Sequence, residues 1–114
     1  HLMPAHSEAV MAALKAVVED EKGTGKKALL PGFQVVGKTA TAQVIDPKTR
    51  RYSNRRYLSS FTGGLLASDQ AWVILALLDG ANPHYYAGDV AAPLFRSIAE
   101  SVAVRFGVRP AAGA

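Results

Sequence analysis

The stretch from Phe33 to Val44, FQVVGKTATAQV, decides the fold class. Its valines and threonines are β-branched residues that favour extended backbone, so the stretch predicts a strand. Pro31-Gly32 marks a turn before it, and Asp46-Pro47 breaks the pattern after it. The neighbouring elements are therefore expected to assemble around this strand.

With Gly32 included, the first part of the stretch also satisfies the phosphate-loop pattern GxxxxGK[ST]. A phosphate loop needs a preceding strand, small residues in the loop and a helix that begins at the Lys-Thr pair. Here residues 33–36 are bulky, and the residues after Thr39 continue as a strand. We therefore interpret Lys38 and Thr39 as strand residues and not as a nucleotide site.

Periodicity predicts the elements on either side. Ser7 is an expected N-cap, and apolar residues at helical spacing predict an amphipathic helix from Glu8 to about Asp20 with its apolar stripe in the core. Asp46 to Arg56 is expected to be a polar connection. It leads to a second strand from Tyr57 to Phe61, which Gly63-Gly64 ends.

A third strand, buried on both faces, is expected from Ala71 to Leu78, although periodicity alone leaves a buried helix open there. Asp89 is the expected N-cap of a last helix, with Pro93 in its first turn. The apolar residues expected to face the sheet are Leu94, Ile98, Val102 and Phe106, and Gly107 ends the helix.

This order of elements predicts an α+β fold, with an antiparallel three-stranded sheet flanked by an N-terminal and a C-terminal helix. The 114 residues are expected to form a single segment, 1–114. Within it, residues 1–6 are interpreted as a candidate tag remnant and residues 109–114 as a flexible tail.

The formal net charge is +4, and much of the excess lies between Lys48 and Arg56, where Tyr52 is interleaved with four arginines. Cations with stacking rings could bind single-stranded nucleic acid, but the turn residues in this segment favour a solvated loop, so no nucleic acid is expected. The chain has no cysteine and therefore no thiol nucleophile. No apolar run approaches the roughly 20 residues of a membrane-spanning helix.

On the strand from Phe33 to Val44, Lys38 and Ala40 should project to one face, and Thr39 and Thr41 to the other. A lysine and two hydroxyls beside free backbone groups could bind an anionic, peptide-like ligand by added-strand pairing and carboxylate contacts. The alternative is an exposed edge strand that its lysine protects from aggregation.

Several motifs of this sequence resemble the transpeptidase domain of class B penicillin-binding proteins, the monofunctional cell-division and elongation enzymes. GKTATAQ at 37–43 is similar to the KTGTAQ strand of that family. GTG at 23–25 and PGF at 31–33 resemble its GTG…PGY lead-in. YLSSFTG at 57–63 is similar to RYxxSFxG, and YYAGDVAAPLF at 85–95 to the YYGGxVAAPVF entry into the last helix.

The resemblance implies the C-terminal third of a transpeptidase domain of the penicillin-binding and serine β-lactamase fold. It carries the KTG-type strand but neither SxxK nor SxN, so the chain alone is expected to be inactive. For the full-length protein of which this chain would be a part, here called the parent, the resemblance implies serine acyl transfer on D-Ala-D-Ala stem peptides. β-Lactams would mimic that substrate, and no cofactor or metal would be needed.

Each site residue takes its expected role from the resemblance. Lys38 would set the charge network and attract the substrate carboxylate, which the hydroxyls of Thr39 and Thr41 would bind. The Thr41 backbone N–H would form half of the oxyanion hole. Ala40 replaces the glycine of the family, and its methyl group would project toward the cleft, which puts full catalytic competence in question.

The expected parent works on the periplasmic face of the bacterial inner membrane, in cell-wall synthesis and division, with membrane contact only through a preceding N-terminal part. The alternative is a noncatalytic penicillin-binding-like scaffold or binding module. The Ala71–Leu78 strand edge should either pair with the remainder of the domain or support a homodimer.

Overall fold

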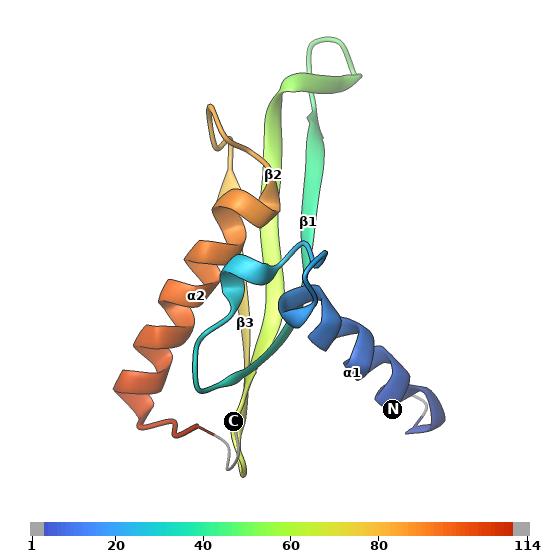
Figure 1. Ribbon diagram of the computed structural model, residues 1–114. Coiled ribbons are helices and arrows are strands. Elements are labelled where there is room, and N and C mark those ends of the chain that lie inside the picture. The colour runs from blue at the N-terminus through green and yellow to red at the C-terminus, as the bar shows by residue number, and fades with distance from the viewer. Residues whose placement is uncertain (1–3, 111–114) are drawn as a thin grey trace.

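Residues 4–110, which the computed structural model describes, contain one antiparallel sheet with its helices on one face (Figure 1). The elements are α1 (Pro4–Glu19), the 3₁₀ turn η1 (Lys26–Ala28), β1 (Gln34–Ile45), β2 (Tyr52–Leu66), β3 (Ala71–Asp79) and α2 (Ala87–Phe106). The sheet order is β1-β2-β3. The predicted α+β class and antiparallel three-stranded sheet are therefore confirmed.

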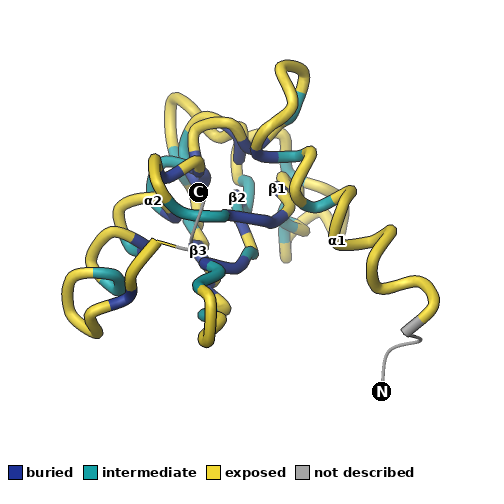
Figure 2. Tube along the Cα trace, turned by 60° about the horizontal axis from the view of Figure 1, so that its bottom comes forward, coloured by how far each residue is buried: buried dark blue, intermediate teal, exposed yellow. Residues whose placement is uncertain are grey.

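The core lies between the sheet and α2, with the ring of Phe61 on the central strand fully buried. Phe61 pairs in register with Thr39 of β1 and Ala76 of β3, so these residues share one face. From the helix side, Ala91 and Phe95 pack against that face. The buried positions consequently concentrate in the middle of the strands and on one side of α2 (Figure 2).

The outer face of β3 is exposed, so the prediction that this strand is buried on both faces is wrong. Val73 is 84% exposed, and Leu75 and Leu77 are also exposed, whereas Ile74 and Ala76 are buried. This alternation arises because α2 covers one face only, and no described element covers the other (Figure 1). The chain therefore presents an apolar stripe that we call the outer β3 stripe (Val73, Leu75 and Leu77).

Helix α1 begins at Pro4, four residues before the predicted start, so Ser7 lies inside the helix and is not its N-cap. Proline is favoured at the first helical position because its missing N–H would have no partner there. The predicted core stripe is wrong at Val10 and Met11, which are exposed, but it holds at the end of α1, where Val18 is fully buried and Val17 packs against the core. The candidate tag remnant overlaps α1 at residues 4–6, whereas residues 1–3 and tail residues 111–114 lie outside the described part.

Strand β2 is much longer than predicted and runs from Tyr52 to Leu66, through Gly63-Gly64. The polar connection shortens to a turn in which the backbone N–H of Asp46 donates to the carbonyl of Arg51 at 2.8 Å. Residues 52–56 were not predicted as strand because they lie at the mostly exposed end of a hairpin, where only Tyr52 is paired in register, with Ile45, and therefore lack an apolar alternation.

Position 63, inside β2, is occupied by glycine because any side chain there would collide with its surroundings. A Cβ atom on Gly63 would lie 2.8 Å from the Phe61 ring, one on Gly37 at 2.5 Å and one on Gly25 at 2.7 Å. These three residues, the ring glycines, come from three separate segments and surround one aromatic ring. Gly37 and Gly63, which would ordinarily weaken their strands, are therefore required here for close packing, since a Cβ atom on Gly63 would also lie 2.3 Å from the carbonyl oxygen of Val36.

Helix α2 begins at Ala87, and its N-cap Tyr86 makes no side-chain cap hydrogen bond, so the prediction of Asp89 as N-cap is wrong. Pro93 lies within the helix and not in its first turn. The fully buried side is made by Ala91, Ala92, Phe95 and Ala99, whereas the predicted Leu94, Ile98 and Val102 are only partly buried at its flank. Phe106 is exposed but stacks on Trp72. Neither helix in residues 4–110 combines the length and apolar character needed to span a bilayer.

Candidate functional site

Strand β1 lies at one edge of the described sheet and has β2 on one side only (Figure 1). Thr39 pairs with the buried Phe61, and Lys38 pairs with the exposed Thr62. The predicted alternation is therefore present: threonine side chains face the helices and the Lys38 side chain begins on the outer face. An edge strand of this kind leaves one side of its backbone open to an extended ligand.

The Thr39 hydroxyl lies between two polar partners. Its Oγ1 is 2.8 Å from Oγ1 of Thr24, in the loop between α1 and η1, and 3.2 Å from Nζ of Lys38. Thr39 is 9% exposed, so these contacts are shielded from most of the solvent. Buried hydroxyls of this kind are held in one geometry by their hydrogen bonds.

The Lys38 ammonium lies at the free edge of β1. Its Nζ donates to the carbonyl oxygen of Thr39 at 2.9 Å and approaches the Thr39 hydroxyl, which lies on the opposite face from the Lys38 Cα–Cβ bond. Because β2 occupies the other side of β1, the lysine side chain passes around the open edge. The positive charge is therefore located beside the edge where a ligand strand would lie.

Thr41 contacts the beginning of α2. The backbone N–H of Ala87 donates to Oγ1 of Thr41 at 2.9 Å. The first N–H groups of a helix have no partner within the helix and carry its partial positive charge, so a hydroxyl oxygen is a suitable acceptor. Both threonines of the strand are thereby connected to other segments of the fold.

The loop before α2 is fixed to β2 by two contacts. The buried hydroxyl of Ser59 donates to the carbonyl oxygen of Tyr85, and the rings of Tyr57 and Tyr85 stack at 3.8 Å with an interplanar angle of 6°. Hydrogen bonding with Tyr57 also raises the pKa of the Tyr85 phenol above its usual value. On the exposed side, Lys27 pairs with Asp89 at 2.9 Å. The two contacts of Tyr85 fix the position of the Ala87 N–H against Thr41, whereas the exposed Lys27–Asp89 pair contributes little.

Ala40 is exposed, and it pairs in register with Ser60 on the outer face of the sheet. Its methyl group is on the same face as the start of the Lys38 side chain. The residue that replaces the glycine of the resembled family is therefore accessible to anything that approaches this edge from the outer face.

The arrangement combines one ammonium with two held hydroxyls, which is suited to binding a carboxylate by charge and hydrogen bonds. It contains no pairing of a nucleophile with a base, since the Ser59 hydroxyl is engaged by a carbonyl group. Within residues 4–110, no group of three or more His, Cys, Asp or Glu could hold a metal ion. The site described here therefore offers one positive charge and two positioned hydroxyl groups to an anionic ligand.

Two groups in this arrangement were not predicted to contribute to the site. Thr24 lies 15 positions before Thr39, and the Ala87 N–H lies 46 positions after Thr41. The GTG motif that contains Thr24 and the small residues at the start of α2 were the available signals. They indicated a family likeness but not these contacts, because the contacts arise only when distant segments pack together.

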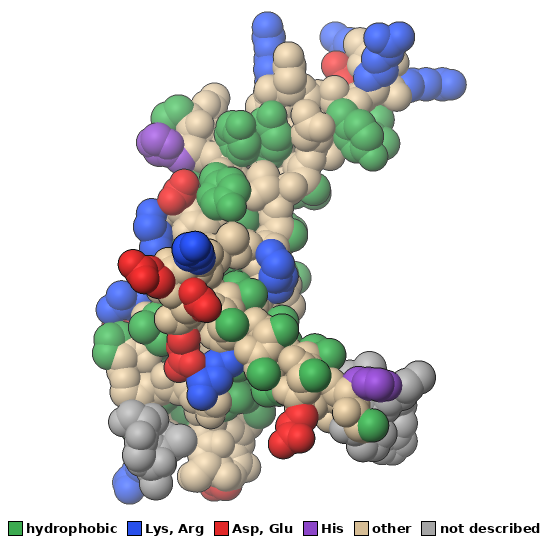
Figure 3. Space-filling model, turned by 45° about the vertical axis from the view of Figure 1, so that its right-hand side comes forward, with side chains coloured by type: hydrophobic (Ala, Val, Ile, Leu, Met, Phe, Trp, Pro, Cys, Tyr) green, Lys and Arg blue, Asp and Glu red, His purple; other side chains and the backbone are tan. Residues whose placement is uncertain are grey.

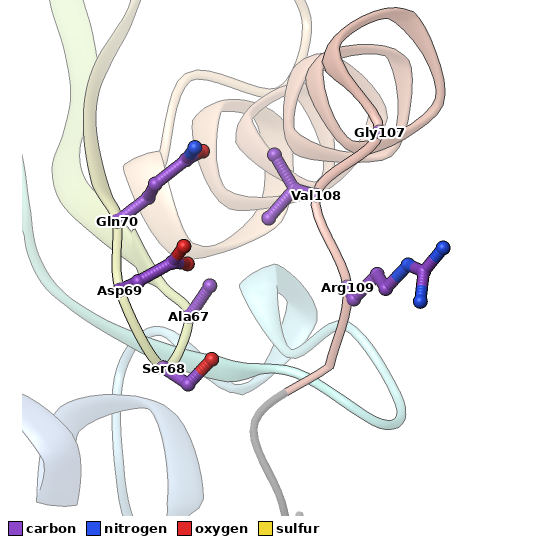
Figure 4. A pocket seen from close by; sticks show the side chains of 7 residues that line it. All are labelled: Ala67, Ser68, Asp69, Gln70, Gly107, Val108 and Arg109. Carbon is purple, nitrogen blue, oxygen red and sulfur yellow. The ribbon is translucent and has the colours of Figure 1, made fainter.

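A cavity of about 290 Å³ lies between the β2–β3 turn and the segment after α2 (Figure 4). It is lined by Ala67, Ser68, Asp69, Gln70, Gly107, Val108 and Arg109. None of the predicted site residues lines it. This cavity is therefore separate from the edge of β1.

The cations predicted in the polar connection lie at the tip of the β1–β2 hairpin (Figure 3). Lys48, Arg50 and Arg51 are exposed there, and Arg56 pairs through two nitrogens with the carboxylate of Asp79 at 3.0 and 2.7 Å. Hydrogen bonding to Arg56 lowers the pKa of Asp79. This part of the net positive charge therefore belongs to the hairpin and not to the Lys38 edge.

Comparisons with known proteins identify the family to which the sequence is similar. The family model described as "Penicillin binding protein transpeptidase domain" matches residues 2–100. The probable peptidoglycan D,D-transpeptidase FtsI of Caulobacter vibrioides is 39% identical over 103 residues, which are 82% of this chain and 18% of that protein. Penicillin-binding protein PbpB of Mycobacterium tuberculosis is 38% identical over 100 residues, 82% of this chain and 15% of that protein.

Solved structures give the same result. The apo form of penicillin-binding protein 3 from M. tuberculosis matches with a TM-score of 0.75 and 35% identity, over 90% of this chain and 25% of that one. The transpeptidase domain of penicillin-binding protein 3 from Burkholderia pseudomallei matches with a TM-score of 0.75 and 28% identity, over 94% of this chain and 32% of that one. The sequence thus spans less than a fifth of these two curated relatives and about a quarter to a third of these two structures.

Proposed function

The chain belongs to the penicillin-binding protein transpeptidase family and corresponds to a part of the transpeptidase domain, and from this we propose that it supplies the substrate-carboxylate strand of a peptidoglycan D,D-transpeptidase. The observation that carries the proposal is the joint position of the Lys38 ammonium and the Thr39 hydroxyl, 3.2 Å apart at an open strand edge. Relatives named as peptidoglycan D,D-transpeptidases support the reaction class.

In the proposed reaction, a serine from another part of the parent attacks the carbonyl carbon between the two D-alanines of a stem peptide. The terminal D-alanine leaves with the proton that the serine loses, and an amine of a second stem peptide then releases the acyl group and restores the serine. β-Lactams would acylate the same serine. M. tuberculosis penicillin-binding protein 3 has been crystallised in complexes with aztreonam and ampicillin, which supports this ligand class.

The residues of β1 would hold the substrate during this reaction. The Lys38 ammonium would attract the terminal carboxylate, and the hydroxyls of Thr39 and Thr41 would donate to it. The Thr41 backbone N–H would donate to the oxyanion, a kind of contact that commonly lowers the barrier by roughly 3 to 4 kcal/mol. The reaction as proposed uses no cofactor.

The parent would act in the bacterial cell envelope, in wall synthesis linked to division, because its relatives include FtsI and the stage V sporulation protein D of Bacillus subtilis. We place its reaction on the periplasmic face of the inner membrane, with the anchor in a part of the parent outside the described residues.

A noncatalytic scaffold or binding module of the same fold is the second candidate, and Ala40 favours it. This residue stands where the resembled motif has glycine, and it is exposed on the Lys38 face. If its methyl group hinders the substrate, the strand edge would keep its positive charge, but the serine of the parent would be acylated slowly.

Labelling the full-length parent with a fluorescent penicillin tests the proposed function. We expect a covalent adduct on the parent and none on the 114-residue chain, which lacks SxxK. The Ala40→Gly variant should label at least as fast as the parent, and a several-fold gain would measure the hindrance by the methyl group. Absence of an adduct on both the parent and the variant would exclude the transpeptidase and favour the binding module.

We further propose that the remainder of the transpeptidase domain covers the outer β3 stripe and pairs with the free edge of β3. Unpaired apolar strand edges recruit partners, and an exposed apolar patch usually marks an interface. The chain spans only 32% of the B. pseudomallei transpeptidase domain, so most of such a domain is available as a partner. Without it, the stripe should favour a homodimer.

The isolated chain should accordingly self-associate at high micromolar concentration, as measured by light scattering or analytical ultracentrifugation. Val73→Ser should shift the equilibrium toward monomer, because it removes apolar area from the interface. Val104→Ser is the matched control, since Val104 on α2 is 85% exposed and Val73 is 84% exposed. A stable monomer, or equal effects of both variants, would contradict the proposed interface.

A further inference from the structure

The hydroxyls of Thr39 and Thr41 both receive hydrogen bonds from within the protein. Oγ1 of Thr41 accepts from the Ala87 backbone N–H at 2.9 Å. Oγ1 of Thr39 is 3.2 Å from the Lys38 ammonium, which can only donate. The remaining partner of Thr39 is the Thr24 hydroxyl at 2.8 Å, and in that pair either oxygen could be the donor.

The direction of the Thr24–Thr39 hydrogen bond decides what Thr39 can offer a ligand. A hydroxyl has one proton and two lone pairs. If Thr24 donates, both lone pairs of Thr39 are occupied and its proton must point to another acceptor. If Thr39 donates instead, its proton is used inside the protein and none is left for a carboxylate.

We propose that Thr24 is a positioning residue whose hydroxyl donates to Thr39, so that the Thr39 proton is directed toward the substrate carboxylate. The Ala87 N–H has the equivalent effect on Thr41, because its donation leaves the Thr41 proton free. A backbone amide and a threonine from two distant segments thus keep both strand hydroxyls available as donors. The ligand named here rests on the proposed function.

The surroundings of Thr24 hold it in the position that this role requires. The N–H of Gly25 donates to the carbonyl of Val17 at 2.9 Å, which fixes the loop to the end of α1. On the other side, a Cβ atom on Gly88 would lie 2.6 Å from the carbonyl oxygen of Thr24, so only glycine allows α2 to approach this closely. The Thr24 backbone is therefore packed between the end of α1 and the start of α2.

The test compares Thr24→Val and Thr24→Ser in the full-length parent. Valine keeps the shape of threonine and removes the hydroxyl, whereas serine keeps the hydroxyl. NMR titration measures noncovalent binding of N-acetyl-D-alanyl-D-alanine and of its C-terminal amide, which lacks the charge. Thermal unfolding midpoints report whether either variant damages the fold.

Thr24→Val should weaken binding of the dipeptide acid several-fold, because the Thr39 hydroxyl loses the donor that orients its proton toward the carboxylate. If Thr39 were instead the donor to Thr24, the same change would free the Thr39 proton and acid binding would be unchanged or tighter. It should leave the weaker binding of the amide unchanged, and Thr24→Ser should bind the acid nearly as the parent does. If Thr24 served folding alone, Thr24→Val would lower the affinity for the acid and the amide alike. Thr24→Ser would then not selectively restore the affinity for the acid. Equal affinity of the valine variant and the parent for the acid, or no binding of the acid by the parent, would overturn the inference.

Penicillin labelling separates this inference from the proposed function. If the parent labels normally but its binding of the acid is insensitive to Thr24→Val, the proposed function stands and the positioning role of Thr24 is excluded. If the parent never labels but its binding of the acid depends on the Thr24 hydroxyl, the positioning role stands and the transpeptidase activity is excluded.

Discussion

Phe61→Ala should lower the free energy of unfolding by about 3–5 kcal/mol, the usual cost of removing a buried aromatic side chain. Phe61 is fully buried, and its ring centroid lies 4.6 Å from that of Phe95. The cavity should not collapse easily, because three of the surrounding positions are the ring glycines and have no side chains to fill it. For a chain of 114 residues, whose total stability is typically about 6–17 kcal/mol, this is a large fraction.

Urea denaturation followed by far-ultraviolet circular dichroism measures this effect at a fixed protein concentration. Phe106→Ala is the matched control, because it removes the same side chain from an exposed position. Phe106 is 56% exposed and stacks on Trp72 at the end of α2. Its loss should cost less than about 1.5 kcal/mol, the usual limit for the contribution of an aromatic pair beyond burial. Similar losses from the two variants would show that Phe61 is not the centre of the core.

Lys38→Met should reduce the second-order rate constant for acylation of the full-length parent by β-lactam roughly 10- to 100-fold, the scale of losing a hydrogen bond to a charged group. Methionine keeps most of the volume but not the ammonium that contacts the carbonyl and hydroxyl oxygens of Thr39. The edge would then lack its positive charge for the ligand carboxylate. Stopped-flow or gel-based labelling with fluorescent penicillin gives the rate constant.

Lys27→Met is the control for this change, because it removes an equal charge from the same region. The Lys27 ammonium pairs with Asp89 at 2.9 Å, but both side chains are more than half exposed. Exposed pairs of this kind contribute about 0–1 kcal/mol, so the acylation rate should hardly change. Equal rates for Lys38→Met and the parent would remove Lys38 from the proposed mechanism.

The sequence predicted the elements whose residues carry a local signal. β-Branched residues placed β1 within one residue of its observed start and end, and the apolar run placed β3 almost completely. The second strand was predicted too short because residues 52–56 lie at the exposed end of a hairpin, so their polarity carries no alternation that would indicate a strand. Gly63 was predicted to end the strand. Sequence alone does not show that the Phe61 ring packs against this position and leaves no room for a side chain.

For the candidate site, alternation along the strand predicted which side chains share a face, since period two is a property of the strand itself. The partners of those side chains could not be predicted in this way. Thr24 reaches Thr39, and the Ala87 N–H reaches Thr41, only because α1, η1 and α2 pack on the same face of the sheet. The exposed outer face of β3 was likewise not predicted, because an apolar run does not reveal which of its two faces the rest of the fold covers.

The ring glycines also restrict the mutational history open to this protein. Gly25 lies in the GTG motif, Gly37 precedes Lys38, and Gly63 closes the SFTG motif, yet all three limit the space around one ring. A methyl group at Gly25 would meet the side chains of Phe61 and Val17, so it should become tolerable once the ring at position 61 is smaller. At Gly37 and Gly63 it would also lie 2.7 Å from the carbonyl oxygen of Thr62 and 2.3 Å from that of Val36, so glycine is required there whatever the size of the ring. Substitutions at Gly25 and Phe61 are therefore expected to be epistatic, whereas positions 37 and 63 are restricted by the backbone itself.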